Sequence, residues 1–104
     1  MAQFDVYLNT DPASQELIPF LLDVQHDLHQ SLVTRTVVPL VRSQFLKQNL
    51  EKLCPCLTVK GEEVIMSTPE LAGYPVRDLG PKIATLADER TTIFSAIDFL
   101  LSGF

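Results

Sequence analysis

The stretch from Asp88 to Phe104, DERTTIFSAIDFLLSGF, has the pattern of an amphipathic helix. Its apolar side chains fall on one face when successive residues are placed about 100° apart. The members of that face are Ile93, Phe94, Ile97, Leu100 and Leu101. We expect Asp88 to cap the start of the helix and Gly103 to end it in a left-handed conformation. A helix with one apolar face must cover a core, so the rest of the chain has to supply that core.

Two phenylalanines near the end of this stretch do not belong to the apolar face. Phe99 falls among small polar residues, so its ring must cover a second surface or stay in water. Phe104 follows Gly103 at the last position of the sequence. One interpretation is a partner-binding surface at this end of the helix. The other is that Phe104 folds back and caps the core.

Short apolar or β-branched segments, separated by turn residues, precede the helix. We expect strands at residues 4–8, 17–24, 34–40, 54–59, 63–67 and 76–86, the last interrupted at Gly80. Pro39 should end the third strand because it cannot donate to a neighbour, and Gly61 should form a hairpin turn between the fourth and fifth. Residues 41–53 predict a short helix or an exposed excursion, and residues 68–70 predict a single helical turn.

Many short strands joined by turns and followed by one helix predict a mainly β fold. We expect a small twisted antiparallel sheet or partly open β-barrel, capped by the C-terminal α-helix. With 104 residues, the chain fits a single domain over residues 1–104. Such a sheet has edges to hide, and we expect a homodimer that covers an edge or Phe99.

The composition narrows the range of partners. The formal net charge is −5, from 8 basic and 13 acidic residues, whereas proteins that grip phosphate backbones usually carry the opposite balance. Direct nucleic-acid binding is therefore disfavoured. No apolar run approaches the ~20 residues of a membrane span, and the sequence does not start with a basic segment followed by an apolar one. We expect no membrane association and a cytoplasmic location.

Residues that could carry catalysis or bind a metal are few. His26 and His29 flank Asp27 and could exchange protons near neutral pH, but a solvated turn after a strand explains them equally well. Cys54 and Cys56 supply at most two of the four ligands of a structural zinc site, and we expect both to be half-buried packing residues. We expect no cofactor, no metal site and no enzymatic activity.

Several segments, taken in order, make this sequence resemble the CcdB family of toxins. They are QFDVY (3–7), DVQHDL (23–28), TRTVVPL (34–40), the stretch 66–76, and AIDFLLSGF (96–104). The resemblance rests on their order and spacing, on the total length, and on the glycine one residue before the end of the sequence. It covers nearly the whole chain.

The resemblance implies a homodimer with an SH3-like barrel core and a C-terminal helix, similar to the layout expected from the pattern of strands. Family members are toxins of toxin–antitoxin pairs that bind the DNA gyrase A subunit and trap the cleaved complex of gyrase with DNA. A partly disordered, CcdA-like antitoxin neutralises them, and joint repression of the operon is expected. DNA would be contacted only indirectly, through gyrase or the antitoxin.

The resemblance also assigns two sets of site residues. The gyrase-facing residues would be Leu28, His29, Asp98, Leu101, Ser102, Gly103 and Phe104. The antitoxin-binding residues would be Asn9, Thr10, Asp11, Glu16, Arg42 and Ser43. The family pattern has Trp where this chain has Ser102 and Asn where it has Asp98, so an aromatic anchor for gyrase is missing.

Three alternatives stay open at the level of sequence. A non-toxic or weakly toxic relative would keep the fold and antitoxin binding. A MazF-like toxin would cleave RNA with residues such as Arg35 or His29, although the pattern around Arg35 favours pairing with a carboxylate, and the net charge of −5 argues against RNA binding. A structural interaction domain would use Phe104 as part of its core.

Overall fold

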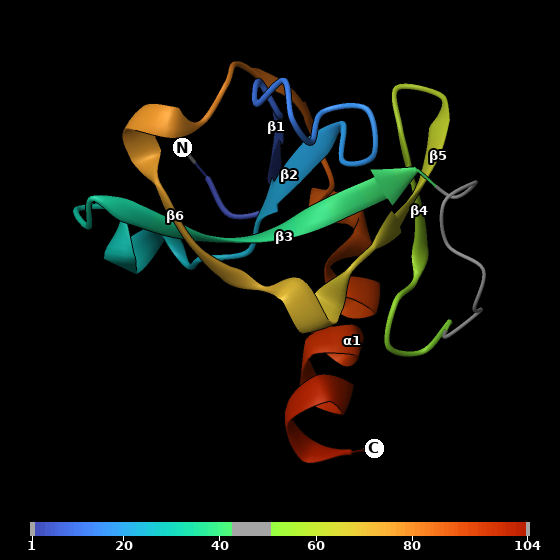
Figure 1. Cartoon of the computed structure of the whole chain (residues 1–104). Coiled ribbons are helices and arrows are strands. Elements are labelled where there is room, and N and C mark those ends of the chain that lie inside the picture. Colours follow the sequence, from blue (N-terminus) through green and yellow to red (C-terminus); the bar gives the residue numbers. More distant parts are fainter. Residues whose placement is uncertain (1, 43–50, 104) are drawn as a thin grey trace.

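The computed structural model describes residues 2–42 and 51–103. These residues form a seven-stranded antiparallel sheet and an α-helix, α1 (Arg90–Ser102) (Figure 1). The strands are β1 (Asp5–Leu8), β2 (Phe20–Asp23), β3 (Thr34–Arg42), β4 (Cys56–Val59), β5 (Glu62–Met66), β6 (Ala72–Pro75) and β7 (Lys82–Thr85). Single turns of 3-10 helix lie between them: η1 (Asp27–His29), η3 (Thr68–Glu70), η4 (Val76–Asp78) and η5 (Ala87–Glu89). The predicted mainly β fold with one C-terminal helix is confirmed.

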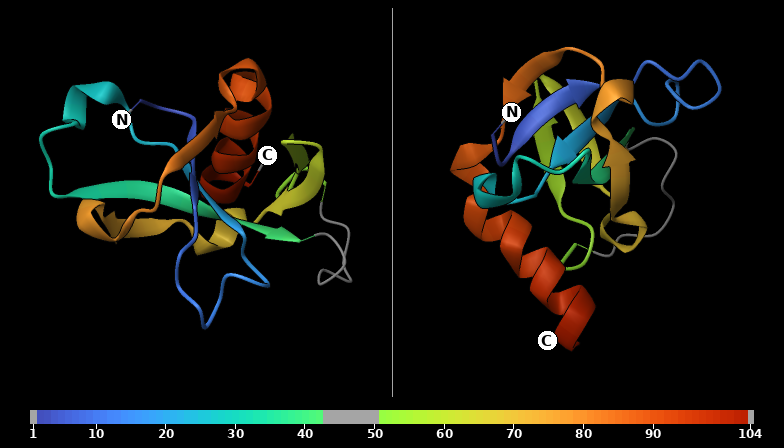
Figure 2. Two further views of the ribbon diagram at one scale, coloured as in Figure 1. Left: turned by 90° about the horizontal axis from the view of Figure 1, so that it is seen from above. Right: turned by 90° about the vertical axis from the view of Figure 1, so that its left-hand side faces the viewer.

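The sheet curls into an open half-barrel around β3. The strand order is β4-β5-β3-β2-β1-β7, with β6 also paired to β3. β3 has nine residues and pairs on one side with β2, and on the other with β6 near its start and β5 near its end. Because β2 pairs only with residues 37–40 of β3, the first residues of β3 extend beyond β2 together with β6 (Figures 1 and 2).

The hydrophobic core lies inside the curl, and the first half of α1 packs against it. The buried core residues are Phe4, Val6, Phe20, Leu22, Val24, Val38, Leu40, Leu57, Val59, Val64, Met66, Leu86, Ile93 and Ala96. The second half of α1 extends past the sheet (Figure 2), which is why Leu100, predicted at the centre of the apolar face, is exposed. No helix in the described residues has the length and apolar content needed to cross a bilayer.

Pro39 does not end its strand, contrary to the sequence-based prediction. It lies in the middle of β3, opposite Leu21 of β2, and its carbonyl oxygen accepts from the Ser67 N–H at 2.9 Å on the other side. In an antiparallel strand the N–H and C=O of one residue point the same way. The missing N–H therefore faces the gap between β5 and β6, where no ladder bond is required.

Other predicted element boundaries shift for local reasons. The apolar run 17–24 contains only the four-residue β2, because residues 12–17 form turns, the last of them closed by the Ile18 N–H, which donates to the Ser14 carbonyl oxygen at 2.8 Å. The run 76–86 contains η4 and β7 instead of one strand, and β6, which the sequence did not predict, lies just before it. Asp88 is not the N-cap, since it lies in η5 and α1 follows Glu89.

The hairpin between β4 and β5 is confirmed and its turn is left-handed. Lys60 and Gly61 have φ of 50° and 81°, the combination that a two-residue turn between twisted antiparallel strands requires. The predicted turn at residues 68–70 is confirmed as η3. Of the predicted excursion at 41–53, Val41 and Arg42 belong to β3, and residues 43–50 lie outside the described part of the chain.

Gly80 provides the tightest backbone approach of the described glycines, between the segment before β7 and the end of β1. A Cβ at this position would lie 2.4 Å from the Leu8 carbonyl oxygen and 2.9 Å from Thr10 Cγ2, whereas a Cβ at Gly73 meets nothing within 4 Å. We expect Gly80→Ala to lower the free energy of unfolding by about 1–3 kcal/mol, because backbone must move to make room. Gly73→Ala is the matched control, with an expected change within about 0.5 kcal/mol in denaturant unfolding. Equal stability of the two variants would contradict this packing.

Candidate functional site

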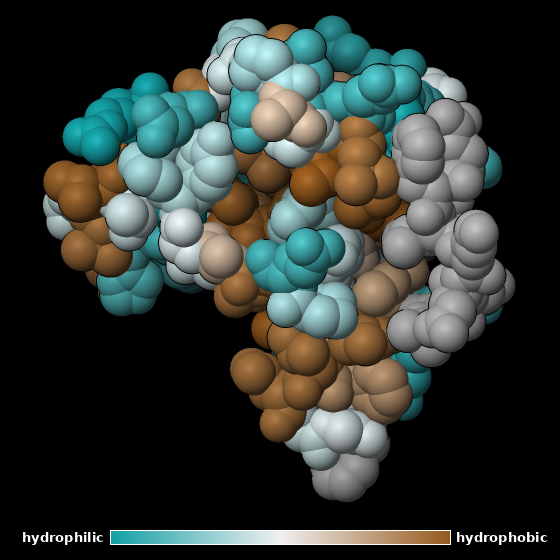
Figure 3. All heavy atoms as spheres, in the orientation of Figure 1, coloured by the Kyte–Doolittle hydropathy of each residue, from teal (hydrophilic) through white to brown (hydrophobic). Residues whose placement is uncertain are grey.

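The exposed large hydrophobic side chains of the described residues gather in three places. Leu28, Leu32 and Val33 follow β2, Leu100 and Leu101 end α1, and Leu8 and Leu17 flank the loop between β1 and β2. Figure 3 shows apolar surface at the end of the β3 and β6 extension and again along the protruding helix. Contiguous apolar surface of this kind marks contacts with other proteins. Two of the three places carry residues predicted to face gyrase, and the third borders the predicted antitoxin site.

The first place is the η1 loop, which we define as residues 24–33. The His26 side chain caps η1, because its Nδ1 accepts from the Leu28 N–H at 2.9 Å. The capped turn holds Leu28 outward, with 77% of its surface exposed, and His29 beside it is also exposed. The predicted solvated turn around the two histidines is thus confirmed, and the turn presents an apolar side chain to the solvent.

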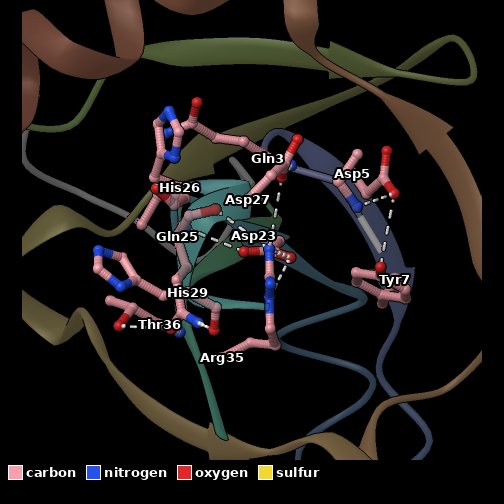
Figure 4. Close-up of polar contacts among 12 residues, drawn as sticks. Gln3, Asp5, Tyr7, Asp23, Gln25, His26, Asp27, His29, Arg35 and Thr36 are labelled. Carbon is pink, nitrogen blue, oxygen red and sulfur yellow. Dashed lines mark hydrogen bonds and ion pairs between the residues drawn. The ribbon is translucent and has the colours of Figure 1, made fainter. Parts of the chain in front are cut away.

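A buried ion pair lies beneath the η1 loop (Figure 4). Arg35 Nε and Nη2 each lie 2.7 Å from Asp23 Oδ2, and both side chains are 0% exposed. Arg35 Nη2 also donates to the Gln25 carbonyl oxygen at 3.1 Å, while Nη1 is buried without a protein partner. Burial raises the pKa of Asp23, and the hydrogen bond from Arg35 opposes that shift. The predicted pairing of Arg35 with a carboxylate is confirmed, and a side chain so enclosed cannot reach an RNA substrate.

Gln25 joins this buried pair to the exposed turn. Its Oε1 accepts from the Thr36 N–H of β3 at 2.9 Å, and its Nε2 donates to the His29 carbonyl oxygen at 2.9 Å. A second contact holds the turn from the N-terminal segment of the chain. The Gln3 N–H donates to Asp27 Oδ1 at 2.7 Å. The position of Leu28 and His29 is therefore set by side chains of the loop and of β3 rather than by an apolar core.

Gln25→Glu should release the η1 turn while keeping its other contact. The carboxylate still accepts from the Thr36 N–H but cannot donate to the His29 carbonyl, so the turn loses one bond and faces repulsion. We expect the Gln30 and Leu32 amides to exchange hydrogen about tenfold faster, with the Thr36 amide unchanged. Gln25→Ala is the control that should expose all three amides. Unchanged exchange at Gln30 and Leu32 in the glutamate variant would rule out this role of Gln25.

Tyr7 is buried near the same ion pair. Burial, reinforced by the Asp5 carboxylate 3.5 Å from the hydroxyl, raises the pKa of Tyr7 from 10.0 to about 12. Between these two pH values the folded chain keeps a proton that the unfolded chain has lost, so the free energy of unfolding falls as pH rises through that window. In the Tyr7→Phe variant, the free energy of unfolding should fall less steeply over the same pH range.

The titration can be followed by tyrosinate absorbance. Tyr7 and Tyr74 are the two tyrosines of the chain, so Tyr74→Phe isolates the signal of Tyr7. We expect its midpoint near pH 12 in the folded chain. A midpoint at the ordinary value in that variant, with the protein still folded, would contradict the burial of the hydroxyl.

The second place is the helix end, which we define as residues 98–103. Asp98, Leu101, Ser102 and Gly103 are exposed, with Leu101 at 78%. Ser102 Oγ donates to the Asp98 carbonyl oxygen at 2.7 Å, and Gly103, with φ of 82°, donates to the Phe99 carbonyl oxygen at 2.9 Å. Gly103 therefore ends the helix as predicted. Phe104 lies outside the described residues.

The sequence left two alternatives for the ring of Phe99, to cover a second surface or to stay in water, and the structure shows the first. Its ring is half-buried, and Lys52 Nζ lies 4.7 Å from the ring centroid. A cation over an aromatic face is attracted by the ring and shields it from water. Phe99 therefore covers a second surface, toward the segment that precedes β4.

Within one chain the two predicted gyrase-facing groups are separate. The η1 loop lies at the start of β3, where β3 pairs with β6, whereas the helix end projects from another side of the molecule (Figures 1 and 2). A single partner that contacts both groups must either span this separation or meet groups from two chains.

The third place is a cavity of about 430 Å³ that brings together three predicted antitoxin-binding residues, Asn9, Glu16 and Arg42. Arg42 Nε donates to the Glu16 carbonyl oxygen at 2.7 Å, and its Nη1 pairs with the Glu62 carboxylate. Thr10 and Asp11 lie in the adjoining loop, while Ser43 lies outside the described residues. Sequence reasoning missed the lining residues Leu8, Pro19, Phe20 and Glu62.

The loop at this cavity is held by its own polar side chains. Asn9 Nδ2 donates to Ser14 Oγ at 3.0 Å and to the Ile18 carbonyl oxygen at 2.8 Å, and its Oδ1 accepts from the Asp11 N–H. Asp11 in turn accepts from the Ala13 N–H and from Ser14 Oγ. A loop fixed in this way can bind a partner with little loss of conformational entropy.

The described residues contain no group of three or more His, Cys, Asp or Glu side chains that could hold a metal ion. Cys54 is half-buried as predicted, but Cys56 is exposed because it alternates outward at the start of β4.

An antiparallel half-barrel with a protruding C-terminal helix and separate apolar surface patches defines a small β protein with surfaces suited to protein partners. A model of the family described as CcdB protein matches residues 3–103. The chain therefore belongs to the CcdB family, and the resemblance inferred from its sequence is confirmed. Membership identifies it with the toxins of toxin–antitoxin systems.

Proposed function

We propose that this chain poisons DNA gyrase: a homodimer binds the gyrase A subunit and traps the complex of gyrase with cleaved DNA, and a cognate antitoxin reverses the effect. The observation that carries the proposal is the outward position of Leu28 and Leu101, which are 77% and 78% exposed. Both occupy positions that the family resemblance assigns to gyrase. Leaving two large apolar side chains in water has no benefit for the folded chain alone, which supports a role in binding.

A two-fold dimer explains how separate groups can serve one target. A symmetric interface presents each exposed group twice, and the gyrase A subunit would meet the η1 loop and the helix end from more than one chain. Poisoning by this route needs no catalytic residue. It also needs no direct grip on DNA, in accord with the net charge of −5.

The antitoxin is proposed to bind at the cavity of Asn9, Glu16 and Arg42. Arg42 ends β3 and Thr34 begins it, so the cavity and the η1 loop lie about 26 Å apart at 3.3 Å per residue. An extended antitoxin segment of about eight residues could span that distance and reach the gyrase-facing loop. A disordered partner is suited to this because it can wrap a long path on a small protein.

A non-toxic relative is the second candidate, and it rests on one position. Ser102 stands where the family pattern has Trp, and its hydroxyl bonds back to the Asp98 carbonyl, so the helix end offers no large ring at this point. Asp98, in place of the family's Asn, adds a negative charge to the same helix end.

The RNA-cleaving alternative loses support because Arg35 is enclosed by Asp23 and Gln25.

The proposal is tested with purified gyrase and supercoiled plasmid. We expect the chain to produce linear DNA after denaturation of the complex, and Leu101→Asp to weaken this effect at least about tenfold, because a buried carboxylate cannot replace an apolar contact. Thr91→Asp, at an exposed position near the start of α1, is the control and should act like the unaltered chain. Full activity of the Leu101 variant, or no cleavage by the unaltered chain, would contradict the proposal.

Ser102→Trp should strengthen binding to the gyrase A subunit. An interface tryptophan commonly contributes about 2–4 kcal/mol, which corresponds to roughly 30-fold or more in Kd. Ser102 is exposed, so the ring can be added without disturbing the core. Isothermal calorimetry of the two proteins measures the change, and unaltered or weaker affinity would show that residue 102 does not face gyrase.

A further inference from the structure

The turn of residues 2–5, which leads into β1, contains a backbone conformation that its sequence disfavours. The Asp5 N–H donates to the Ala2 carbonyl oxygen at 3.0 Å and closes the turn. Phe4, the third residue, has φ of 73°, whereas φ of Gln3, the second residue, is not positive. This is the pattern of a type II turn, which prefers glycine or asparagine at the third position. A bulky side chain is strained there, and such strain persists only where surrounding contacts enforce it.

The contacts that enforce the conformation of Phe4 connect it to the start of α1. Its N–H donates to the Asp23 carbonyl oxygen at 2.6 Å, and its carbonyl oxygen accepts from the Leu86 N–H at 2.8 Å. The Phe4 ring is 4% exposed and meets the Phe94 ring of α1 edge to face, with centroids 5.4 Å apart. The guanidinium carbon of Arg90 lies 4.6 Å from the Phe94 centroid and 5.9 Å from the Phe4 centroid. Both rings and the cation attract one another.

Gln3, the residue before Phe4, holds the η1 loop instead. Its N–H donates to Asp27 Oδ1 at 2.7 Å (Figure 4), and its Nε2 donates to the Val24 carbonyl oxygen at 3.1 Å. Both acceptors belong to the η1 loop. Two successive residues of the 2–5 turn therefore hold two different elements, the η1 loop through Gln3 and α1 through Phe4.

The strain at Phe4 makes these two sets of contacts depend on each other. The φ angle of Phe4 sets the direction of the chain that precedes it, so a change in φ displaces Gln3 relative to β1. If the Phe4 ring leaves Phe94, the residue can return to an ordinary φ, and Gln3 then moves away from Asp27. Conversely, release of Gln3 from Asp27 removes a restraint on the same angle.

We propose that the 2–5 turn is a strained link that couples the η1 loop to the start of α1, so that the two elements open as one local unit. Opening of either element lets Phe4 return to an unstrained conformation, which releases the other. A partner bound to one element therefore slows the opening of the other. This coupling is a property of the folded chain and is independent of whether gyrase is the target.

The first test perturbs the helix side and measures hydrogen exchange in the loop of the whole chain. Arg90→Ala removes the cation from both rings at an exposed position, so folding should be retained. We expect the amides of Gln30 and Leu32, which donate within the η1 loop, to exchange about two- to fivefold faster. Thr91→Ala, at the next exposed position of α1, is the matched control and should leave both rates unchanged. The Gln15 amide, in the β1–β2 loop, should be unaffected in either variant.

The second test perturbs the loop side and measures exchange in the helix. Asp27→Ala removes the acceptor of the Gln3 N–H, and we expect the Phe94 amide to exchange at least about threefold faster. Asp78→Ala is the control, because the Asp78 side chain has the same 54% exposure as that of Asp27. It should leave the Phe94 rate unchanged.

The strain itself is tested by comparing Phe4→Gly with Phe4→Ala. Both variants lose the ring, but only glycine adopts a φ near 73° without strain. We expect the glycine variant to melt about 4 °C above the alanine variant. An equal or lower melting temperature of the glycine variant would show that Phe4 is not strained and would overturn the proposed link.

The exchange measurements decide the coupling without these core variants. Unchanged rates at Gln30 and Leu32 in Arg90→Ala, or at Phe94 in Asp27→Ala, would show that the loop and the helix open separately and would overturn the coupling. Equal acceleration of the Gln15 amide would show that the loop opens only when the whole chain unfolds, which contradicts a local unit.

Discussion

The Arg35–Asp23 ion pair is the interaction on which the surrounding structure depends. Asp23 ends β2 and Arg35 lies near the start of β3, so the pair closes the mouth of the loop between the two strands. Removing two charges from water is costly, and a buried pair often adds little net stability compared with apolar residues. Breaking it by removing one partner costs about 3–5 kcal/mol, because the remaining charge stays buried. The pair thus fixes one geometry of the loop more than it adds to overall stability.

A short series of hydrogen bonds connects the buried ion pair to the exposed η1 loop. Arg35 binds the Gln25 carbonyl, the Gln25 side chain binds the His29 carbonyl, and His26 caps the turn that carries Leu28. The position of the exposed η1 loop therefore depends on the buried guanidinium of Arg35. The helix end is positioned differently, by Ile93 and Ala96 in the core at the other end of a rigid helix. The proposed gyrase surface combines one element held by polar contacts with one held by apolar packing.

The sequence predicted the elements of this fold better than their boundaries. Periodicity identified the helix, β1 and the β4–β5 hairpin because each has a local cause, such as an apolar stripe or a glycine turn. The prediction at Pro39 was wrong because the tolerance of a proline depends on which neighbour its strand meets at that point, a property of the sheet register and not of the local sequence. The exposure of Leu100 depends in the same way on where the sheet ends beneath α1.

The candidate site was predictable in part, and the reason differs between its members. The family resemblance supplied Leu28, Leu101, Asn9 and Arg42, whose positions the structure now describes. Glu62 at the cavity could not be found, because only the pairing of β3 with β5 brings this residue to Arg42. The measurement that tests the central claim most directly is growth after induction of this chain in bacteria with a sensitive gyrase A subunit and in bacteria whose subunit resists CcdB toxins. We predict killing of the sensitive cells alone, whereas equal killing of both strains, or survival of both with the protein shown to accumulate, would contradict gyrase as the target.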